Sequence, residues 1–239
     1  MPKLSGTLSG REQIAAGTWA FHFALPGGLF AYKPGQTIDV TIPNPTHQDS
    51  EGNKRTFSIA VAPGAETLLI ATRVRGSAFK RNLVEGKIGM PLEIEGPFGS
   101  FTLPNKPGAF VFLAGGIGIT PFRAMAEDAI DRRLTHSLFL IHSNRAPEEA
   151  PFLKELQGWS AANPSFRYLP TMTDVDPSRW TGERRRIGPE LLAEVLPADR
   201  NEPIYYIAGP DGFVKGMAEA LKGIGVDEDR VRSEEFPGY

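Results

Sequence analysis

A glycine-rich segment directly after an apolar run is the clearest candidate for ligand binding in this sequence. Residues 110–114 are apolar. The segment that follows contains Gly115, Gly116, Gly118, Thr120 and Pro121. A buried strand that ends in a glycine turn and a helix start offers free backbone N–H groups to a diphosphate. Thr120 can cap the helix, and Pro121 suits its first turn. Because proline replaces the third glycine of the usual fingerprint, the loop predicts an unusual nucleotide site.

A second turn of this kind follows the apolar run at residues 204–208. It consists of Ala208, Gly209 and Pro210, and a helix-like segment follows it. A Gly-Pro pair by itself more often only ends a strand. Two glycine turns at strand ends can face one ligand, so together they predict a dinucleotide cleft.

Arg55, Thr56, Phe57 and Ser58 form a different chemical set. Arginine can hold a diphosphate through two parallel hydrogen bonds, phenylalanine offers a face to an aromatic ring, and serine can bond a ring nitrogen. These residues suit a flat, anionic ligand. Strand alternation would place Arg55 and Phe57 on the face opposite Thr56 and Ser58, unless the strand bends.

The composition excludes several kinds of chemistry. The 239 residues include no cysteine, which excludes disulfides, thiolate zinc sites and cysteine-ligated iron–sulfur clusters. The four histidines have no metal-binding spacing, and the net charge of −2 gives no electrostatic case for nucleic acid. No apolar stretch approaches the roughly 20 residues that span a bilayer, and no leader is seen, so we expect a cytoplasmic protein without a transmembrane segment.

Two kinds of elements must position these motifs. Before residue 103, apolar and polar residues alternate in short segments between turns, which predicts an antiparallel β-barrel over residues 1–103. After it, apolar runs alternate with helix-like segments, which predicts a doubly wound α/β domain with a parallel sheet over residues 104–239. The expected helices cover residues 122–133, 149–161, 189–196 and 212–222.

The motifs and their order resemble the ferredoxin–NADP reductase superfamily over almost the whole chain. Its Arg-x-Tyr-Ser signature corresponds to residues 55–58, with Phe57 in place of tyrosine. Its glycine loop corresponds to residues 115–121, and its Cys-Gly-Pro motif to residues 208–210, with Ala208 in place of cysteine. The other matching segments are 34–36, 73–80 and 96–101. The resemblance implies a flavin-binding β-barrel followed by an NAD(P)-binding α/β domain, with FAD as the usual flavin.

The resemblance also implies roles for single residues. Arg55 would bind the flavin diphosphate, Phe57 would cover one face of the flavin, and Ser58 would lie near its N5 atom, with Thr56 beside them. Further flavin contacts would come from Arg73, Gly76, Ser77, Ala78, Phe79 and Lys80. The glycine loop, with Gly209 and Pro210, would hold NAD(P)H. Ala208 would lie at the hydride-transfer site.

The carboxyl-terminal residues extend this expectation. Relatives place a carboxylate and an aromatic residue from this end near the flavin. Glu234 fits that position better than Glu235, and Phe236 or Tyr239 would shield the ring. The alternative is an exposed acidic tail.

The preferred coenzyme depends on charge near the adenosine ribose. Asp174 follows the third predicted strand of the α/β domain, where phosphate-selective relatives have arginine, and this favours NADH. Arg145 and the run at residues 184–186 could instead favour NADPH.

The sequence thus predicts a flavin-dependent oxidoreductase that transfers hydride from NADH or NADPH to FAD. Because the chain has no cysteines for an iron–sulfur cluster, electrons would pass to a separate ferredoxin, flavodoxin or haem protein. The alternatives are a reductase that releases flavin as a product, and a regulatory module with weak redox activity.

Overall fold

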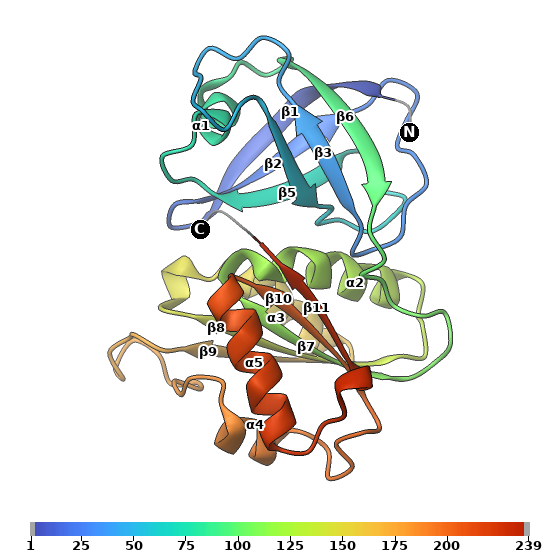
Figure 1. Ribbon diagram of the computed structural model, residues 1–239, viewed down its shortest axis with the longest axis vertical. Coiled ribbons are helices and arrows are strands. Elements are labelled where there is room, and N and C mark those ends of the chain that lie inside the picture. Colours follow the sequence, from blue (N-terminus) through green and yellow to red (C-terminus); the bar gives the residue numbers. More distant parts are fainter. Residues whose placement is uncertain (1–2, 237–239) are drawn as a thin grey trace.

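The structure is a computed structural model that describes residues 3–236, and it consists of two sheets stacked one above the other (Figure 1). The first sheet has six antiparallel strands in the order β4-β3-β6-β1-β2-β5. Its strands are β1 (Leu4–Ala15), β2 (Thr18–Ala24), β3 (Thr37–Thr41), β4 (Lys54–Ser58), β5 (Leu68–Arg73) and β6 (Pro91–Phe98). The sheet curls into an open barrel, and α1 (Ala78–Glu85) lies at its side.

The predicted alternation of apolar and polar residues builds the barrel core. Phe21 and Phe23 on β2 and Ile38 and Val40 on β3 are all fully buried in one cluster. Inward-facing positions of successive strands thus meet, as expected for an antiparallel sheet with one buried face. The predicted barrel is confirmed.

The second sheet has five parallel strands in the order β11-β10-β7-β8-β9. These are β7 (Ala109–Gly115), β8 (Ser137–Asn144), β9 (Phe166–Met172), β10 (Ile204–Gly209) and β11 (Val231–Glu235). The helices are α2 (Thr120–Asp131), α3 (Leu153–Ala162), α4 (Pro189–Val195) and α5 (Asp211–Gly223). Short 3₁₀ turns occur at Gly116–Ile119, Pro147–Glu149 and Glu228–Arg230.

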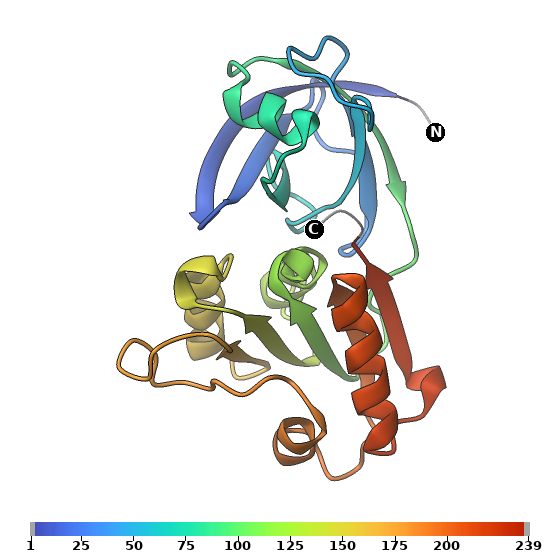
Figure 2. The ribbon, with the colours of Figure 1, turned by 60° about the vertical axis from the view of Figure 1, so that its left-hand side comes forward.

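The helices cover both faces of this sheet, which confirms the predicted doubly wound fold. Helices α2 and α3 pack on one face, and α4 and α5 pack on the other (Figure 2). The chain leaves β7 toward the first face and β10 toward the second, although these strands are neighbours. Such a divergence opens a crevice at the carboxyl ends of the strands, where ligands bind in open α/β sheets.

The start of α2 differs from the expectation. A 3₁₀ turn, Gly116–Ile119, separates β7 from α2, and the helix begins at Thr120 itself. The Thr120 hydroxyl donates to the Ile117 carbonyl at 3.2 Å and caps no amide of α2. The prediction that Thr120 caps the helix is therefore wrong, because Ile119 is already helical and the chain has no extended residue at which a cap could form.

Strand β11 was not expected from the sequence. Its residues, Val231–Glu235, are mostly polar, and the sequence predicts a flavin-proximal tail there. In the structure they pair in parallel with β10, so that Glu234 lies opposite Ala208 and Glu235 opposite Gly209. The Phe236 amide continues the pairing by donating to the Gly209 carbonyl at 3.0 Å. An edge strand with one neighbour tolerates polar residues that a central strand would not.

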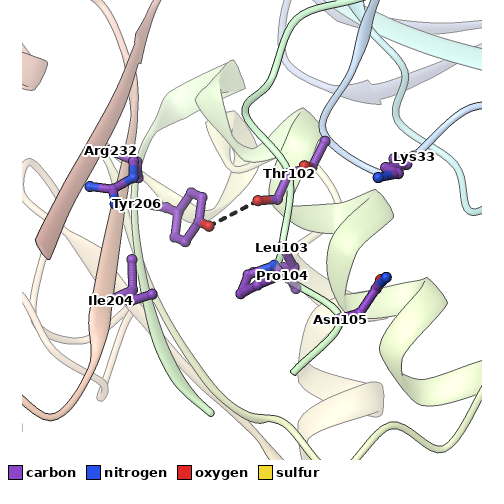
Figure 3. Close-up of a pocket in the computed structure, with 8 residues that line it drawn as sticks. All are labelled: Lys33, Thr102, Leu103, Pro104, Asn105, Ile204, Tyr206 and Arg232. Carbon is purple, nitrogen blue, oxygen red and sulfur yellow. Dashed lines mark hydrogen bonds between the residues drawn. The ribbon is translucent and has the colours of Figure 1, made fainter. Parts of the chain in front are cut away.

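The connection between the sheets runs from Phe98 to Ala109, and the domain boundary that we propose after residue 103 falls within it. The Tyr206 hydroxyl on β10 donates to the Thr102 carbonyl at 2.9 Å and holds this segment against the second sheet (Figure 3). A cavity of about 300 Å³ lies beside this bond, between Lys33 and Arg232.

Helix α2 lies between the two sheets and joins them by polar contacts (Figure 2). The buried Arg123 guanidinium donates to the Ala60 carbonyl and to both carboxylate oxygens of Glu155, at 2.9 and 2.7 Å. The Ala62 amide in turn donates to Glu127 at 2.6 Å. These contacts attach α2 to the chain just beyond β4. Within residues 3–236, no helix has the length and apolar character that crossing a bilayer requires.

Candidate functional site

A cavity of about 1130 Å³ opens between the two sheets. The first half contributes β4 and the start of α1, and the second half contributes the 3₁₀ turn after β7, the first residue of α2 and the end of β11. The cavity has a basic end in the first half and a junction end where the halves meet. It is large enough for an extended ligand with an aromatic ring.

Cations and a helix start surround the basic end. Arg55, Arg75 and Lys80 line it, and burial together with Arg55 lowers the pKa of Lys80. The Arg55 guanidinium donates to Glu51 at 2.6 Å, and the Ala78 amide at the start of α1 donates to an Asp49 carboxylate oxygen at 2.7 Å. Groups that bind carboxylate oxygens in this way are also suited to phosphate oxygens.

The aromatic wall comes from β4. Phe57 lines the cavity, and Phe79 lies in the barrel core behind it with ring centroids 5.8 Å apart. The Thr56 hydroxyl donates to Asp39 at 2.5 Å. Residues 55–58 all line the cavity, although alternation predicts two opposite faces. Because β4 is an edge strand, the cavity reaches both of its faces.

The junction end brings together Ser58 from β4 and Glu234 from β11. Burial raises the pKa of Glu234 to about 7, and the nearby Ser58 hydroxyl opposes this rise. Among the described residues, neither Ser58 Oγ nor Glu234 Oε2 has a hydrogen-bond partner of ordinary geometry. Buried polar atoms without partners are costly, so both suit a ligand that carries hydrogen-bonding atoms. A flavin, with its ring nitrogens at one end and its diphosphate at the other, fits this distribution of groups.

The two candidate carboxylates differ in exposure. Glu234 and Glu235 both line the cavity, but Glu235 is exposed and Glu234 is partly buried. Phe236 lines the same end. The geometry therefore favours Glu234 as the residue that faces the ligand.

A second cavity, of about 340 Å³, lies at the carboxyl ends of the parallel strands. Gly115, Gly116 and Pro210 line it, as the two glycine turns predicted. Arg75 and Ile117 line both cavities, so the two are neighbours with a shared wall. Ile117 belongs to the 3₁₀ turn after β7, so the two cavities adjoin where the halves meet.

Glycine occupies these turn positions for different geometric reasons. Gly116 has a left-handed φ of +54°, and a side chain there would meet nothing within 4 Å. A Cβ at Gly115 would lie 2.8 Å from the Phe213 ring, and one at Gly118 would lie 2.2 Å from the Ala208 carbonyl oxygen. Gly116 therefore borders the cavity. Glycine at position 115 lets the Phe213 ring pack against the loop, and glycine at position 118 lets the Ala208 carbonyl approach the loop backbone.

Arg73, for which the family resemblance implies a flavin contact, lies away from the basic end. It lines the second cavity and donates to Glu149 at 2.5 Å. The reason is its place at the end of β5, which faces the α/β half across the junction. Gly76, Ser77 and Lys80 do lie at the basic end.

Arg145, which lines the second cavity, forms an ion pair with Asp174 beside it. The Arg145 guanidinium donates to Asp174 at 2.8 Å, and the Asp174 amide donates to the Arg145 carbonyl at 2.8 Å. Both side chains are about two-thirds exposed, at 66% and 65%. The two residues that predicted opposite coenzyme preferences are thus direct partners.

Several predicted residues line neither cavity. Ala208 is fully buried, and Phe79 belongs to the barrel core. Five others also line neither cavity: Ala78, Gly118, Pro121, Asp174 and Gly209. Tyr239 lies outside the described residues.

The structure also identifies residues that the sequence did not single out. Arg75 and Ile117 line both cavities, and Phe213 packs under both glycine turns. The position of Phe213 directly after the Gly-Pro turn is a signal that could have revealed it. Within residues 3–236, no cluster of histidine, aspartate and glutamate is suited to a metal ion.

Comparisons with known proteins agree on one kind of protein. Residues 112–219 match the family described as oxidoreductase NAD-binding domain. The chain is 30% identical to ferredoxin–NADP reductase B of Sorangium cellulosum over 218 residues, which cover 88% of this chain and 87% of that protein. It is 30% identical to a flavohemoprotein of Pseudomonas putida over 230 residues, but this match covers 95% of this chain and only 57% of the relative.

A solved structure shares the fold over the full length. The flavohem-like FAD/NAD-binding domain of nitric oxide dioxygenase from Vibrio cholerae superimposes with a TM-score of 0.84, and the match covers 98% of each chain. Its sequence identity is 18%, so this comparison establishes the fold.

Proposed function

Because the chain belongs to the ferredoxin–NADP reductase family and is an FAD-dependent NAD(P)H oxidoreductase, we propose that it carries electrons from NADH to a separate acceptor protein. The acceptor is a ferredoxin, a flavodoxin or a haem protein. The relatives support this class, since one is named for ferredoxin and another for a haem protein.

The observation that carries the proposal is the shared wall of the two cavities. Arg75 and Ile117 border both, so a ligand in the coenzyme cavity and a ring in the larger cavity can approach each other at the junction. Hydride transfer requires such direct approach, which a protein provides by positioning both partners.

In the larger cavity, Arg55 and the start of α1 would hold the FAD diphosphate, and Phe57 would cover part of the ring system. Ser58 and Glu234 would bond the polar edge of the ring at the junction end. When bound, FAD supplies the conversion between a two-electron nicotinamide donor and a one-electron acceptor.

Glu234 is the group that can hold or move a proton at this site. With a pKa near 7, its carboxyl is protonated in a sizeable fraction of molecules at neutral pH. Glu234 is partly buried at the junction end, and the pairing of β11 with β10 fixes its position at the edge of the cavity. Its protonated form can donate to a ring nitrogen, and its anion can stabilise positive charge on the nicotinamide.

The Arg145–Asp174 pair supports NADH as the preferred coenzyme. Asp174 neutralises the arginine that would otherwise bind a 2′-phosphate, and its carboxylate would repel that phosphate. The ribose hydroxyls of NADH can accept or donate hydrogen bonds at the same place without this repulsion.

An anaerobic titration of the FAD-loaded protein tests the proposal. NADH is expected to bleach the flavin band near about 460 nm, and NADPH should do so at higher concentration. Reduced protein should then reoxidise rapidly with a ferredoxin, flavodoxin or cytochrome. Retention of FAD through gel filtration separates this function from a reductase that releases flavin. Failure of both coenzymes to bleach bound flavin would contradict the proposed function.

A further inference from the structure

The glycine loop rests on a buried histidine that belongs to neither cavity. His142 lies on β8, next to β7, and its side chain is completely buried. Its Nε2 atom lies 2.8 Å from the Gly116 carbonyl oxygen, and its Nδ1 atom lies 3.0 Å from the Tyr168 hydroxyl oxygen. Tyr168 comes from β9, so two neighbouring strands and the 3₁₀ turn after β7 contribute to this chain of hydrogen bonds.

These contacts allow one arrangement of protons. A carbonyl oxygen only accepts hydrogen bonds, so Nε2 carries the ring proton and donates it to Gly116. Nδ1 then has no proton and accepts from the Tyr168 hydroxyl. Full burial lowers the pKa of His142 to about 4, so the ring stays neutral at physiological pH.

The contact fixes the direction of a peptide group in the loop. Gly116 adopts a left-handed conformation, and its carbonyl turns inward toward His142. In a planar trans peptide the carbonyl and the following amide point in opposite directions, so the Ile117 N–H points away from His142. Gly116 and Ile117 both border the coenzyme cavity. An inward carbonyl therefore removes a repulsive oxygen from the side on which a phosphate would bind.

We propose that His142 is a positioning residue for the coenzyme, because it holds the Gly116 peptide with its carbonyl inward and its amide side toward the cavity. This inference rests on the proposed function of that cavity. His142 touches neither cavity, and it acts through the loop backbone. Tyr168 contributes by keeping the histidine in the tautomer that can donate to Gly116.

The test compares two substitutions at one position in FAD-loaded protein. His142→Met removes the donor, whereas His142→Gln keeps an amide N–H at about the place of Nε2. We expect His142→Met to raise the Kd for NAD⁺ and the KM for NADH about tenfold, with kcat for ferricyanide reduction within about twofold of wild type. For His142→Gln, the Kd for NAD⁺ and the KM for NADH should both stay within about threefold of wild type.

A matched control uses the other buried histidine of this half. His136 lies just before β8, edge-on to Phe110, at the opposite end of the strands from the glycine loop. His136→Gln is therefore expected to leave the Kd and KM unchanged. Tyr168→Phe provides an independent variant with the imidazole intact, and a rise of about two- to threefold in KM is expected because the tautomer is no longer enforced.

The outcomes separate the two proposals. Wild-type coenzyme affinity in His142→Met, or equal losses in His142→Met and His142→Gln, would overturn the positioning role. If His142→Met does not fold, an unchanged KM in Tyr168→Phe together with a weakened His142→Gln would do the same. A wild-type protein that binds no NAD⁺ and keeps its flavin oxidised with NADH would instead overturn the proposed function itself.

Discussion

The Arg145 guanidinium and the Asp174 carboxylate lie 2.8 Å apart, and a backbone hydrogen bond joins the same two residues. A coenzyme with a 2′-phosphate must compete with Asp174 for this arginine. We expect Asp174→Asn to raise the ratio of kcat/KM for NADPH to that for NADH about tenfold, because both the competition and the repulsion are removed. Steady-state kinetics with ferricyanide measure the ratio.

The neighbouring residue Asp176 provides the control, since its carboxylate bonds Ser178 rather than Arg145. Asp176→Asn should leave the coenzyme ratio at its wild-type value. An equal ratio in Asp174→Asn and wild type would show that this ion pair does not select the coenzyme.

Glu234 makes stability depend on pH in a defined direction. Its pKa is raised to about 7 in the folded protein, so the native state holds a proton that the unfolded chain has already released. Stability from this group is fully present below the unfolded pKa and is lost as pH rises through about 7. In flavin-free protein, the stability of Glu234→Gln relative to wild type should increase by about 3 kcal/mol between about pH 4 and about pH 8.

Urea unfolding at several pH values measures this difference. Glu235→Gln is the matched control, because Glu235 is the exposed neighbour on the same strand. The prediction fails if the Glu234→Gln difference is independent of pH.

Arg123 connects the halves from a buried position. It contacts the Ala60 carbonyl in the first half and Glu155 in the second, so its loss leaves a buried carbonyl and a carboxylate without their partner. We expect Arg123→Met to lower the free energy of unfolding by about 3 kcal/mol. Chemical denaturation of flavin-free protein provides the measurement.

An exposed arginine elsewhere tests whether position or charge matters. Arg179 pairs with Glu148 at 2.8 Å, and both side chains are largely exposed. Arg179→Met should cost less than about 1 kcal/mol. Similar losses in the two variants would argue against the interdomain role of Arg123.

Arg55 should control how tightly the flavin is held. It lines the basic end, and its guanidinium lies 5.5 Å from the ring centre of Phe79, which packs behind the aromatic wall. Removal of a charged hydrogen-bond donor costs about 1.5–3 kcal/mol, so Arg55→Met should raise the Kd for FAD at least about tenfold. Fluorescence titration of flavin-free protein with FAD measures this.

Arg81 on α1 is a suitable control, because it is exposed and pairs only with Glu85. Arg81→Met is expected to bind FAD as wild type does. A normal FAD affinity in Arg55→Met would remove this residue from the proposed flavin site.

Local patterns predicted most of the fold. The alternation of Phe21, Phe23, Ile38 and Val40 identified the barrel core, because inward positions of a strand repeat every second residue. The apolar runs of β7, β8 and β10 identified the parallel sheet. Strand β11 escaped prediction, since its polar sequence is stabilised by pairing with β10 and not by an apolar face of its own.

The sequence predicted the motifs of the candidate site but not the contacts between side chains from different loops. The sequence identified both glycine turns and the segment at residues 55–58, because glycine allows close approach of the backbone to a ligand and arginine can bind a diphosphate. It could not reveal that Arg145 pairs with Asp174, or that Arg73 pairs with Glu149, since these contacts join loops from different strands. No sequence pattern indicated a role for His142, because its contact is with the backbone carbonyl of Gly116.

The placement of Glu234 has an evolutionary consequence. The carboxylate belongs to a strand of the α/β half, yet it borders the cavity whose aromatic wall comes from the barrel. A chimera that joins this barrel to the α/β half of a relative would therefore inherit the relative's acid together with its coenzyme preference. Under the proposed roles, proton handling and nucleotide choice would be inherited together, and flavin retention separately.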